Sequence, residues 1–282
     1  MSPRPGSHVA ARLAEVVRAR LSAAPARPVV LGLCGAQGSG KSTVALRLEE
    51  SLADSGVSAA RLSIDDLYLS RRDRAGLAQT YPLAATRGPP GTHDISLGLE
   101  TLDRLGQVGE TALPRFDKAA DDRLPAEIWP VVKTPVEVVI LEGWCVGATP
   151  EAAKALERPI NDLERNEDPD GRWRHWVNDQ LAGSYQRLFA RIDVLALLAA
   201  PSFAVVPRWR GEQEAALQRR LKARGEDASG CLDRASLARF VAHYERLTRH
   251  ILTEMPSRAD VTIRLDTQRR PVGVSLLEPA LP

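Results

Sequence analysis

The chain has 282 residues, of which 44% are hydrophobic and 26% are charged, and its formal net charge is only +2. This balance is typical of a globular protein and argues against binding to nucleic acid or to a membrane surface. The three cysteines are far apart and form no C-x-x-C pair or Cys/His cluster, so we expect neither a disulfide framework nor a zinc site. No apolar run is long enough to span a membrane and no signal peptide is visible, so we expect a cytoplasmic protein.

The N-terminal segment, residues 1–27, is expected to start disordered over residues 1–6 and then to form a helix. Ser7 is the expected N-cap, and Pro25 and Pro28 are expected to end the helix. Apolar residues recur with helical spacing at Val9, Leu13, Val16, Val17 and Leu21.

Residues 29–43, VVLGLCGAQGSGKST, carry the most informative pattern of the chain. An apolar run predicts a strand over 29–34, a G-x-x-x-x-G-K-S motif follows, and a helix is predicted from about Gly40 to Asp54. Glycines let backbone N–H groups curl around phosphate oxygens, and the helix N-terminus adds a positive dipole end. We therefore expect ATP or another nucleoside triphosphate here, with Lys41 on the β- and γ-phosphates and Ser42 on Mg²⁺. The predicted phosphate-binding residues are Gly35, Ala36, Gln37, Gly38, Ser39, Gly40, Lys41, Ser42 and Thr43.

A second strand is predicted from Val57 to Ile64, and it ends at Asp65 and Asp66. A kinase must take a proton from the attacking hydroxyl, and a carboxylate near the phosphates can accept it. The spacing does not decide which of the two aspartates does so.

Two long loops are predicted next, over residues 70–92 and 107–133, on either side of a helix at 95–105. Together residues 70–133 form the expected acceptor-binding region. A small anionic acceptor needs cationic donors, and arginine suits a carboxylate because its fork can donate two hydrogen bonds. The polar side chains of these loops include Arg87, His93, Asp94, Arg115, Lys118, Arg123 and Lys133.

The second half of the chain continues the alternation of strands and helices. An apolar strand at 136–141 ends at Glu142, a Walker B pattern in which the acid holds Mg²⁺ directly or through water. Residues 149–170 are ambiguous, and a helix at 173–189 and a strand at 192–198 follow. A helix over about 202–225, interrupted early by Pro207, presents Arg208 and Arg210, which could act as a lid over the γ-phosphate. Asp233 is the expected cap of a further helix, and a last, edge strand is predicted at 261–265.

This order predicts an α/β protein with a mostly parallel sheet and helices on both of its faces, the three-layer fold of P-loop NTPases. We expect one kinase domain over residues 1–282. Ligands of such sheets collect at the carboxyl ends of the strands. The P-loop, the aspartate pair, Glu142 and the turn at Ala200 and Pro201 should therefore converge.

Several of these segments together resemble the P-loop kinases of the D-glycerate 3-kinase type, which are similar to uridine kinase, phosphoribulokinase and bacterial pantothenate kinase. The segments are GAQGSGKST, SIDDLYL, RGPPGTHD, RFDKAADDR, VVILEGWCVG and WRGEQE, within residues 28–255. The resemblance implies that Asp65 is the general base. It places Asp66, Arg87, His93, Asp94, Lys118 and Arg123 on the acceptor side, and residues 202–226, with Arg208 and Arg210, in the lid.

The expected activity is therefore transfer of the ATP γ-phosphate to a hydroxyl of a small organic acid, with D-glycerate first. One alternative is another acceptor, such as pantothenate, a nucleoside or a sugar phosphate. A second is a nucleotide-binding regulator without catalysis. A GTPase is not favoured because the sequence has no N-K-x-D guanine motif. The oligomeric state does not follow from the sequence.

Overall fold

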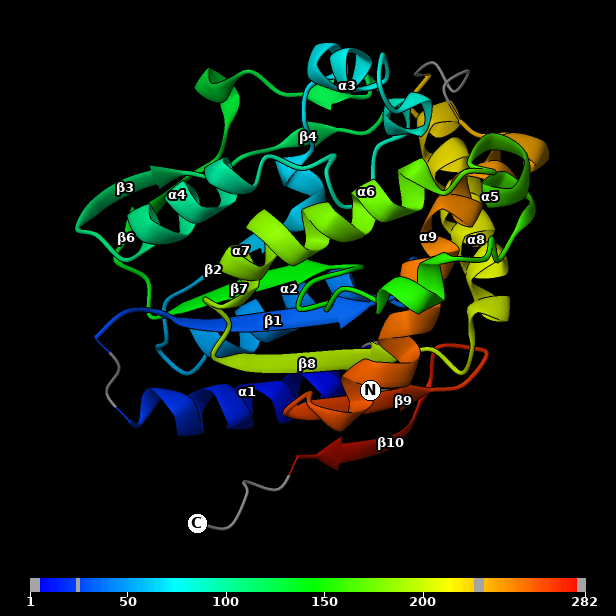
Figure 1. Cartoon of the computed structure of the whole chain (residues 1–282). Helices are drawn as coiled ribbons and strands as arrows, with labels where there is room; N and C mark the ends of the chain where they lie inside the picture. The colour runs from blue at the N-terminus through cyan, green and yellow to red at the C-terminus, as the bar shows by residue number, and fades with distance from the viewer. Residues whose placement is uncertain (1–5, 24–25, 226–230, 278–282) are drawn as a thin grey trace.

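Six strands form the central sheet, in the order β10-β9-β8-β1-β7-β2 (Figure 1). The computed structural model describes residues 6–23, 26–225 and 231–277. Of residues 1–6, which the sequence predicts to be disordered, only Gly6 is described, and Pro25, an expected helix end, also lies outside the described residues. Neighbouring strands from β9 to β2 are parallel, and β10 pairs with β9 antiparallel. The strands are β1 (Val29–Gly35), β2 (Ala59–Ser63), β7 (Val138–Gly143), β8 (Val194–Ala199), β9 (Val261–Leu265) and β10 (Pro271–Leu276).

Alternating residues of the parallel strands contribute to two apolar layers. On β1, Val30 lies in one cluster of buried residues, whereas Leu31 and Leu33 lie in the other. The Leu31 cluster contains α1 (Ser7–Leu21), α2 (Lys41–Ala53) and the start of α8 (Val206–Ala223). The Val30 cluster contains α4 (Ile95–Leu105), α7 (Gln186–Phe189) and α9 (Arg234–Glu254). The predicted mostly parallel sheet with helices on both faces is confirmed.

Three details of the predicted elements need correction. Strand β9 is not at the edge of the sheet, because β10 pairs with it on its outer side. Strand β10, with the sequence PVGVSL, is mostly exposed and therefore lacks the buried apolar run that predicts a strand. Ser7 is the first residue of α1, and Gly6 is its N-cap. Pro207 does not interrupt α8, because it lies in the first turn, where a missing N–H breaks no helical hydrogen bond.

The two predicted loops contain regular structure that hydrophobic periodicity did not reveal. Residues 70–92 include α3 (Arg71–Leu77), whose N-cap Ser70 accepts a hydrogen bond from the backbone of Asp73 and whose buried member is Arg74. Residues 107–133 contain two short ribbons: β3 (Gly109–Ala112) with β6 (Val131–Thr134), and β4 (Phe116–Asp117) with β5 (Asp122–Arg123). Polar contacts and caps, rather than an apolar stripe, stabilise α3.

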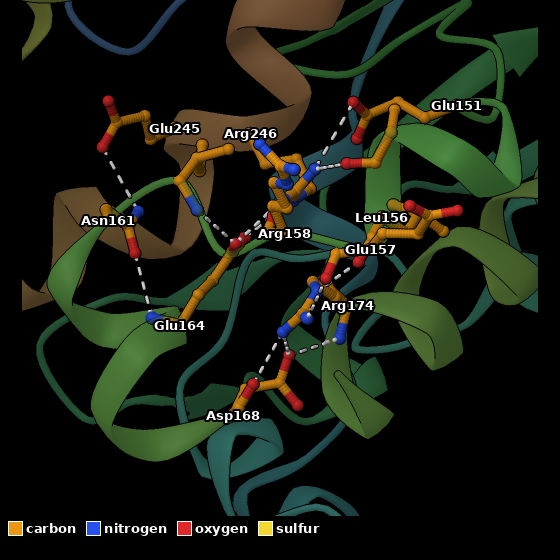
Figure 2. A network of polar contacts seen from close by, with 12 residues as sticks. Glu151, Leu156, Glu157, Arg158, Asn161, Glu164, Asp168, Arg174, Glu245 and Arg246 are labelled. Carbon is orange, nitrogen blue, oxygen red and sulfur yellow. Dashed lines mark hydrogen bonds and ion pairs between the residues drawn. The ribbon is translucent and has the colours of Figure 1, made fainter. Parts of the chain in front are cut away.

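A buried polar network anchors the segment that the sequence left ambiguous (Figure 2). On α9, Arg246 contacts both carboxylate oxygens of Glu164 at 2.7 Å. On α6 (Arg172–Gln180), Arg174 pairs with Asp168 at 3.0 Å and donates to the Leu156 carbonyl at 2.6 Å. Glu164 belongs to α5 (Asp162–Glu167). These contacts tie residues 156–168 to α6 and α9.

The remaining local structure consists of short tight turns. The 3-10 segments are Ile64–Leu67, Pro82–Ala85, Ala126–Ile128, Ala153–Leu156, Phe203–Val205 and Met255–Ser257, and a π-helical turn spans Leu181–Tyr185. Among the described residues, no helix is both long and apolar enough to cross a membrane.

Candidate active site

The glycine-rich loop connects β1 to α2 as the sequence predicts. Gly40 is the N-cap of α2 with a φ of 92°, and Gly38 has a φ of 76°, both in the left-handed region that favours glycine. The Ser39 N–H donates to the Ala36 carbonyl at 3.0 Å and closes the turn. The free N–H groups at the start of α2 therefore follow a tightly turned loop, which is the arrangement that binds phosphate.

Ser42, in the first turn of α2, meets Glu142 near the carboxyl end of β7. The Ser42 hydroxyl donates to Glu142 Oε1 at 2.8 Å. Glu142 is buried, and its Oε2 atom has no hydrogen-bond partner among the described residues. A hydroxyl beside a buried carboxylate oxygen without a partner suits Mg²⁺, which prefers oxygen ligands. The described residues contain no group of three or more His, Cys, Asp or Glu side chains that could hold a metal, so phosphate and water would have to supply the other ligands.

Asp65 faces two cations. Its Oδ2 atom accepts a bond from Lys118 Nζ at 2.5 Å, and its Oδ1 atom accepts one from the Tyr68 hydroxyl at 2.8 Å. Burial alone would raise the pKa of Asp65, but the charges of Lys118 and Lys41 outweigh it and lower the pKa well below its usual range. Asp65 is therefore an ionised carboxylate within electrostatic reach of the P-loop lysine.

Asp66 has a different environment. It accepts a hydrogen bond from the Phe116 N–H at 3.1 Å and lies 3.4 Å from an Arg115 nitrogen. Burial raises the pKa of Asp66 to about 6, although Arg115 and the Phe116 N–H oppose this. Asp66 thus fastens the segment that carries Lys118.

The other predicted acceptor residues form a connected set beside Asp65. Arg87 pairs with Asp121 and lies over the Phe116 ring. Arg123 Nη2 donates to the Tyr68 carbonyl at 3.0 Å and contacts Asp94 at 3.3 Å. The other oxygen of Asp94 caps α4 through the Leu97 N–H. Asp94 and Arg123 are therefore held by each other as well as by the backbone.

His93 is buried and electrically neutral. Its ring stacks on Tyr68 with 4.6 Å between centroids, and its Nδ1 atom lies 2.5 Å from the Tyr185 hydroxyl. Burial lowers the pKa of His93 to about 3. The Tyr185 oxygen also accepts the Gly91 N–H, and because a hydroxyl can both donate and accept, the contact with Nδ1 is compatible with either neutral tautomer of the imidazole. The Nε2 atom of His93 is buried and has no partner among the described residues.

The two most specific sequence motifs are in direct contact. Trp144 of ILEGW donates from Nε1 to the Gly88 carbonyl of RGPPGTHD at 3.1 Å. Tyr244 on α9 donates to the neighbouring Arg87 carbonyl at 3.0 Å. A Cβ at Gly88 would lie 1.8 Å from the Tyr244 hydroxyl, and the φ of Gly88 is 125°, so only glycine fits. These contacts place His93 and Asp94 beside the strand ends.

The proposed lid arginines have other partners in this structure. Arg208 donates to the Thr267 carbonyl and lies 3.8 Å from Glu212. Arg210 pairs with Glu214 at 2.6 Å and lies over the Phe240 ring. Neither contacts Asp65 or Lys41 here, and their role above the γ-phosphate stays a prediction.

Sequence reasoning missed several residues that shape this site. Tyr68, Tyr185 and Tyr244 are three of the four tyrosines of the chain, and each bonds a site residue or its backbone. Arg269 was also missed, although its Nε atom donates to the P-loop carbonyl of Gly38 at 2.6 Å. Because tyrosine is rare in this chain, its few tyrosines could have been chosen as candidate site residues. Nothing near Arg269 in the sequence indicates its contact with the Gly38 carbonyl.

Known proteins similar to this chain are kinases. The model of the Phosphoribulokinase / Uridine kinase family matches residues 30–152. A fission yeast (Schizosaccharomyces pombe) protein named "Uncharacterized kinase mug58" is 33% identical, over 77% of this chain and 79% of its own length. The chain belongs to the phosphoribulokinase/uridine kinase family. The predicted kinase activity is thereby confirmed.

The similarity to two further proteins extends over most of the chain. The chloroplastic D-glycerate 3-kinase of Arabidopsis thaliana is 28% identical over 87% of this chain, which spans only 54% of that protein. The structure of D-glycerate 3-kinase from Cryptococcus neoformans superposes with a TM-score of 0.78 and covers 95% of this chain and 99% of that one. Its sequence is 22% identical, so it confirms the three-layer P-loop fold alone.

Proposed function

We propose that this kinase transfers the γ-phosphate of ATP to a hydroxyl of a small organic acid, with D-glycerate as the acceptor and 3-phosphoglycerate as the product. The observation that carries the proposal is the Asp65–Lys118 pair at 2.5 Å, within electrostatic reach of Lys41. It offers a base for a hydroxyl and a cation for a carboxylate on one side of the P-loop. The similarity to the Arabidopsis enzyme supports the choice of D-glycerate.

The donor side consists of the loop Gly35 to Thr43 and Glu142. Backbone N–H groups of this loop and Lys41 would hold the triphosphate and stabilise the charge on its transferring oxygens. Ser42 and Glu142 would hold Mg²⁺, as their shared hydrogen bond and the buried Oε2 atom suggest. When bound, Mg²⁺ neutralises charge on the β- and γ-phosphate oxygens.

On the acceptor side, Lys118 can pair either with Asp65 or with the carboxylate of a bound acceptor. While Lys118 faces Asp65, it lowers the pKa of that carboxylate and makes it a weak base. An acceptor carboxylate that draws Lys118 away would raise the basicity of Asp65 as the substrate binds. The hydroxyl proton then passes to Asp65, the hydroxyl oxygen bonds to the γ-phosphorus, and the bond from that phosphorus to the ADP oxygen breaks.

The test is an ADP-release assay with D-glycerate, pantothenate, uridine and ribulose 5-phosphate in parallel. We expect D-glycerate to give the highest kcat/KM, because the loops offer cations. The nucleoside alternative has some support, since a uridine kinase from Leuconostoc citreum is 26% identical over 58% of this chain. A far higher kcat/KM for uridine than for any acid would overturn the proposal.

A further inference from the structure

The turn between β9 and β10 lies against the P-loop, 231 positions away in sequence. It is closed by the Asp266 N–H, which donates to the Arg270 carbonyl at 2.9 Å. Within it, Arg269 has a φ of 63°. A side chain in this left-handed region is strained, and such strain persists only where the surroundings hold it. The contacts of Arg269 show what holds it.

The Arg269 guanidinium joins three segments. Its Nε atom donates to the Gly38 carbonyl at 2.6 Å, and its Nη2 atom lies 2.5 Å from a carboxylate oxygen of Glu212 on α8. The group also lies over the Trp209 ring, 5.1 Å from its centroid. Charge-assisted hydrogen bonds of this kind are stronger than neutral ones, and the Arg269 side chain is only 28% exposed.

The same three segments are packed without space between them. Trp209 is fully buried, and its Nε1 atom donates to the Thr267 carbonyl of the turn at 3.0 Å. A Cβ at Gly38 would lie 2.6 Å from the Cβ of Trp209. The loop therefore rests directly on the first turns of α8.

Both sides of the Gly38–Ser39 peptide are fixed as a result. A trans peptide points its carbonyl and its N–H in opposite directions. The Ser39 N–H bonds to the Ala36 carbonyl within the loop, and the Gly38 carbonyl bonds outward to Arg269. A loop that already has its bound shape loses less conformational entropy when a ligand binds.

We propose that Arg269 is a positioning residue that holds the P-loop in its phosphate-binding shape. It fixes the outer peptide of the loop, while Glu212 and Trp209 fix the guanidinium. The proposal rests on nucleotide binding at the P-loop, but it is independent of which acceptor the enzyme uses.

The direct test compares Arg269→Ala with Arg270→Ala. Arg270 occupies the same turn, but its side chain is 77% exposed and pairs with Asp266. ATP affinity is measured by titration without acceptor, together with the KM values for ATP and for the acceptor and the thermal unfolding midpoint. We expect Arg269→Ala to weaken ATP binding about tenfold, as the loss of one such bond predicts, and to leave the acceptor KM unchanged. Arg270→Ala should bind ATP as the wild type does.

A purely structural role would give a different result. Arg269→Ala would then lower the unfolding midpoint while the folded protein kept its ATP affinity, or it would raise both KM values equally. Either result overturns the proposal. If Arg269→Ala does not fold, Glu212→Gln decides, because it leaves Arg269 in place and removes the charge that orients it. A twofold to fivefold loss of ATP affinity supports the proposal, and unchanged affinity refutes it.

Because ATP is titrated alone, inactivity toward D-glycerate would refute the proposed function and leave this result intact.

Discussion

Asp65 and Asp66 are adjacent in sequence, yet their surroundings separate their roles. Asp65 faces Lys118 and the P-loop lysine, whereas Asp66 accepts the Phe116 N–H and pairs with Arg115. A proton acceptor must reach the substrate hydroxyl, and only Asp65 has a charge partner on the P-loop side. The higher pKa of Asp66 would suit a base, but its two oxygens hold the loop.

Asp65→Asn should separate proton transfer from binding. The variant keeps the shape of the side chain and loses its basicity. A positioned base contributes roughly 10²–10⁴ in rate, or about 3–5 kcal/mol of barrier, so we expect kcat to fall by that factor while ATP affinity stays nearly unchanged. Asp66→Asn should cost kcat much less. Steady-state kinetics and ATP titration of both variants check this, and a crippled Asp66→Asn with a near-normal Asp65→Asn would reverse the assignment.

At the scale of elements, the sequence predicts what buried apolar runs and local chemistry determine. The strand before the P-loop and the strand that carries Glu142 are fully buried, so both stand out as apolar runs. Asp233 caps α9 through the Ser236 N–H, as its position predicts. The loop interiors could not be predicted in this way. Arg74 is buried in α3 because it donates to the carbonyls of Leu69, Ala85 and Asp121, which are distant or non-helical partners.

The candidate site likewise has parts that the local sequence predicts and parts that depend on distant contacts. The P-loop and the Walker B acid are contiguous motifs, and their meeting follows from the parallel sheet. The choice between Asp65 and Asp66 depends on Lys118 and Phe116, some 50 residues later, and a single sequence does not place these beside them. The turn that carries Arg269 reaches the P-loop only through the pairing of β9 with β10, and the mostly exposed β10 gives no strand pattern in the sequence.

We propose that Lys118, in the segment between β4 and β5, binds the acceptor, so its loss should weaken the binding of the acceptor and not that of ATP. We expect Lys118→Ala to raise the acceptor KM about thirtyfold, which corresponds to about 2 kcal/mol for one charge-assisted bond, and to change the KM for ATP little. Lys133→Ala is the matched control, because Lys133 lies on β6 in the other ribbon of this region. Equal rises in both KM values would contradict the assignment of Lys118.

At the scale of the whole molecule, segments that are far apart in the sequence meet at residues 87–93, next to the site. Trp144 after β7, Tyr185 before α7 and Tyr244 on α9 all bond the residues 87–93. The network of Arg246 and Arg174 joins α9 and α6 to residues 156–168. These contacts support the prediction that residues 1–282 form one domain, which stays a prediction.

Because these contacts bury titratable groups, stability should depend on pH. The native pKa of His93 is about 3 against an ordinary value of 6.5, and that of His243 is about 4, in both cases mainly through burial. Below pH 6.5 the unfolded chain binds protons at these histidines that the native state does not bind. The free energy of unfolding is therefore retained above pH 6.5 and falls as the pH drops toward 4, by at most about 1.4 kcal/mol per pH unit for each histidine. Asp66 opposes this below pH 6, because its raised native pKa binds a proton more readily than the unfolded chain does.

Urea unfolding at pH 7.5, 6.5 and 5 measures the net effect. We expect the wild type to keep its stability between pH 7.5 and 6.5 and to lose stability between pH 6.5 and 5, where the two histidines outweigh the opposing carboxyl groups of Asp66 and Glu151, whose pKa values burial raises. His93→Gln should lower the stability at pH 7.5 but make the decline toward pH 5 shallower, because one of the two groups no longer titrates in the unfolded chain. His175→Gln, at an exposed position on α6, should leave the slope unchanged. If His93→Gln keeps the full slope of the wild type, His93 is not buried in its neutral form.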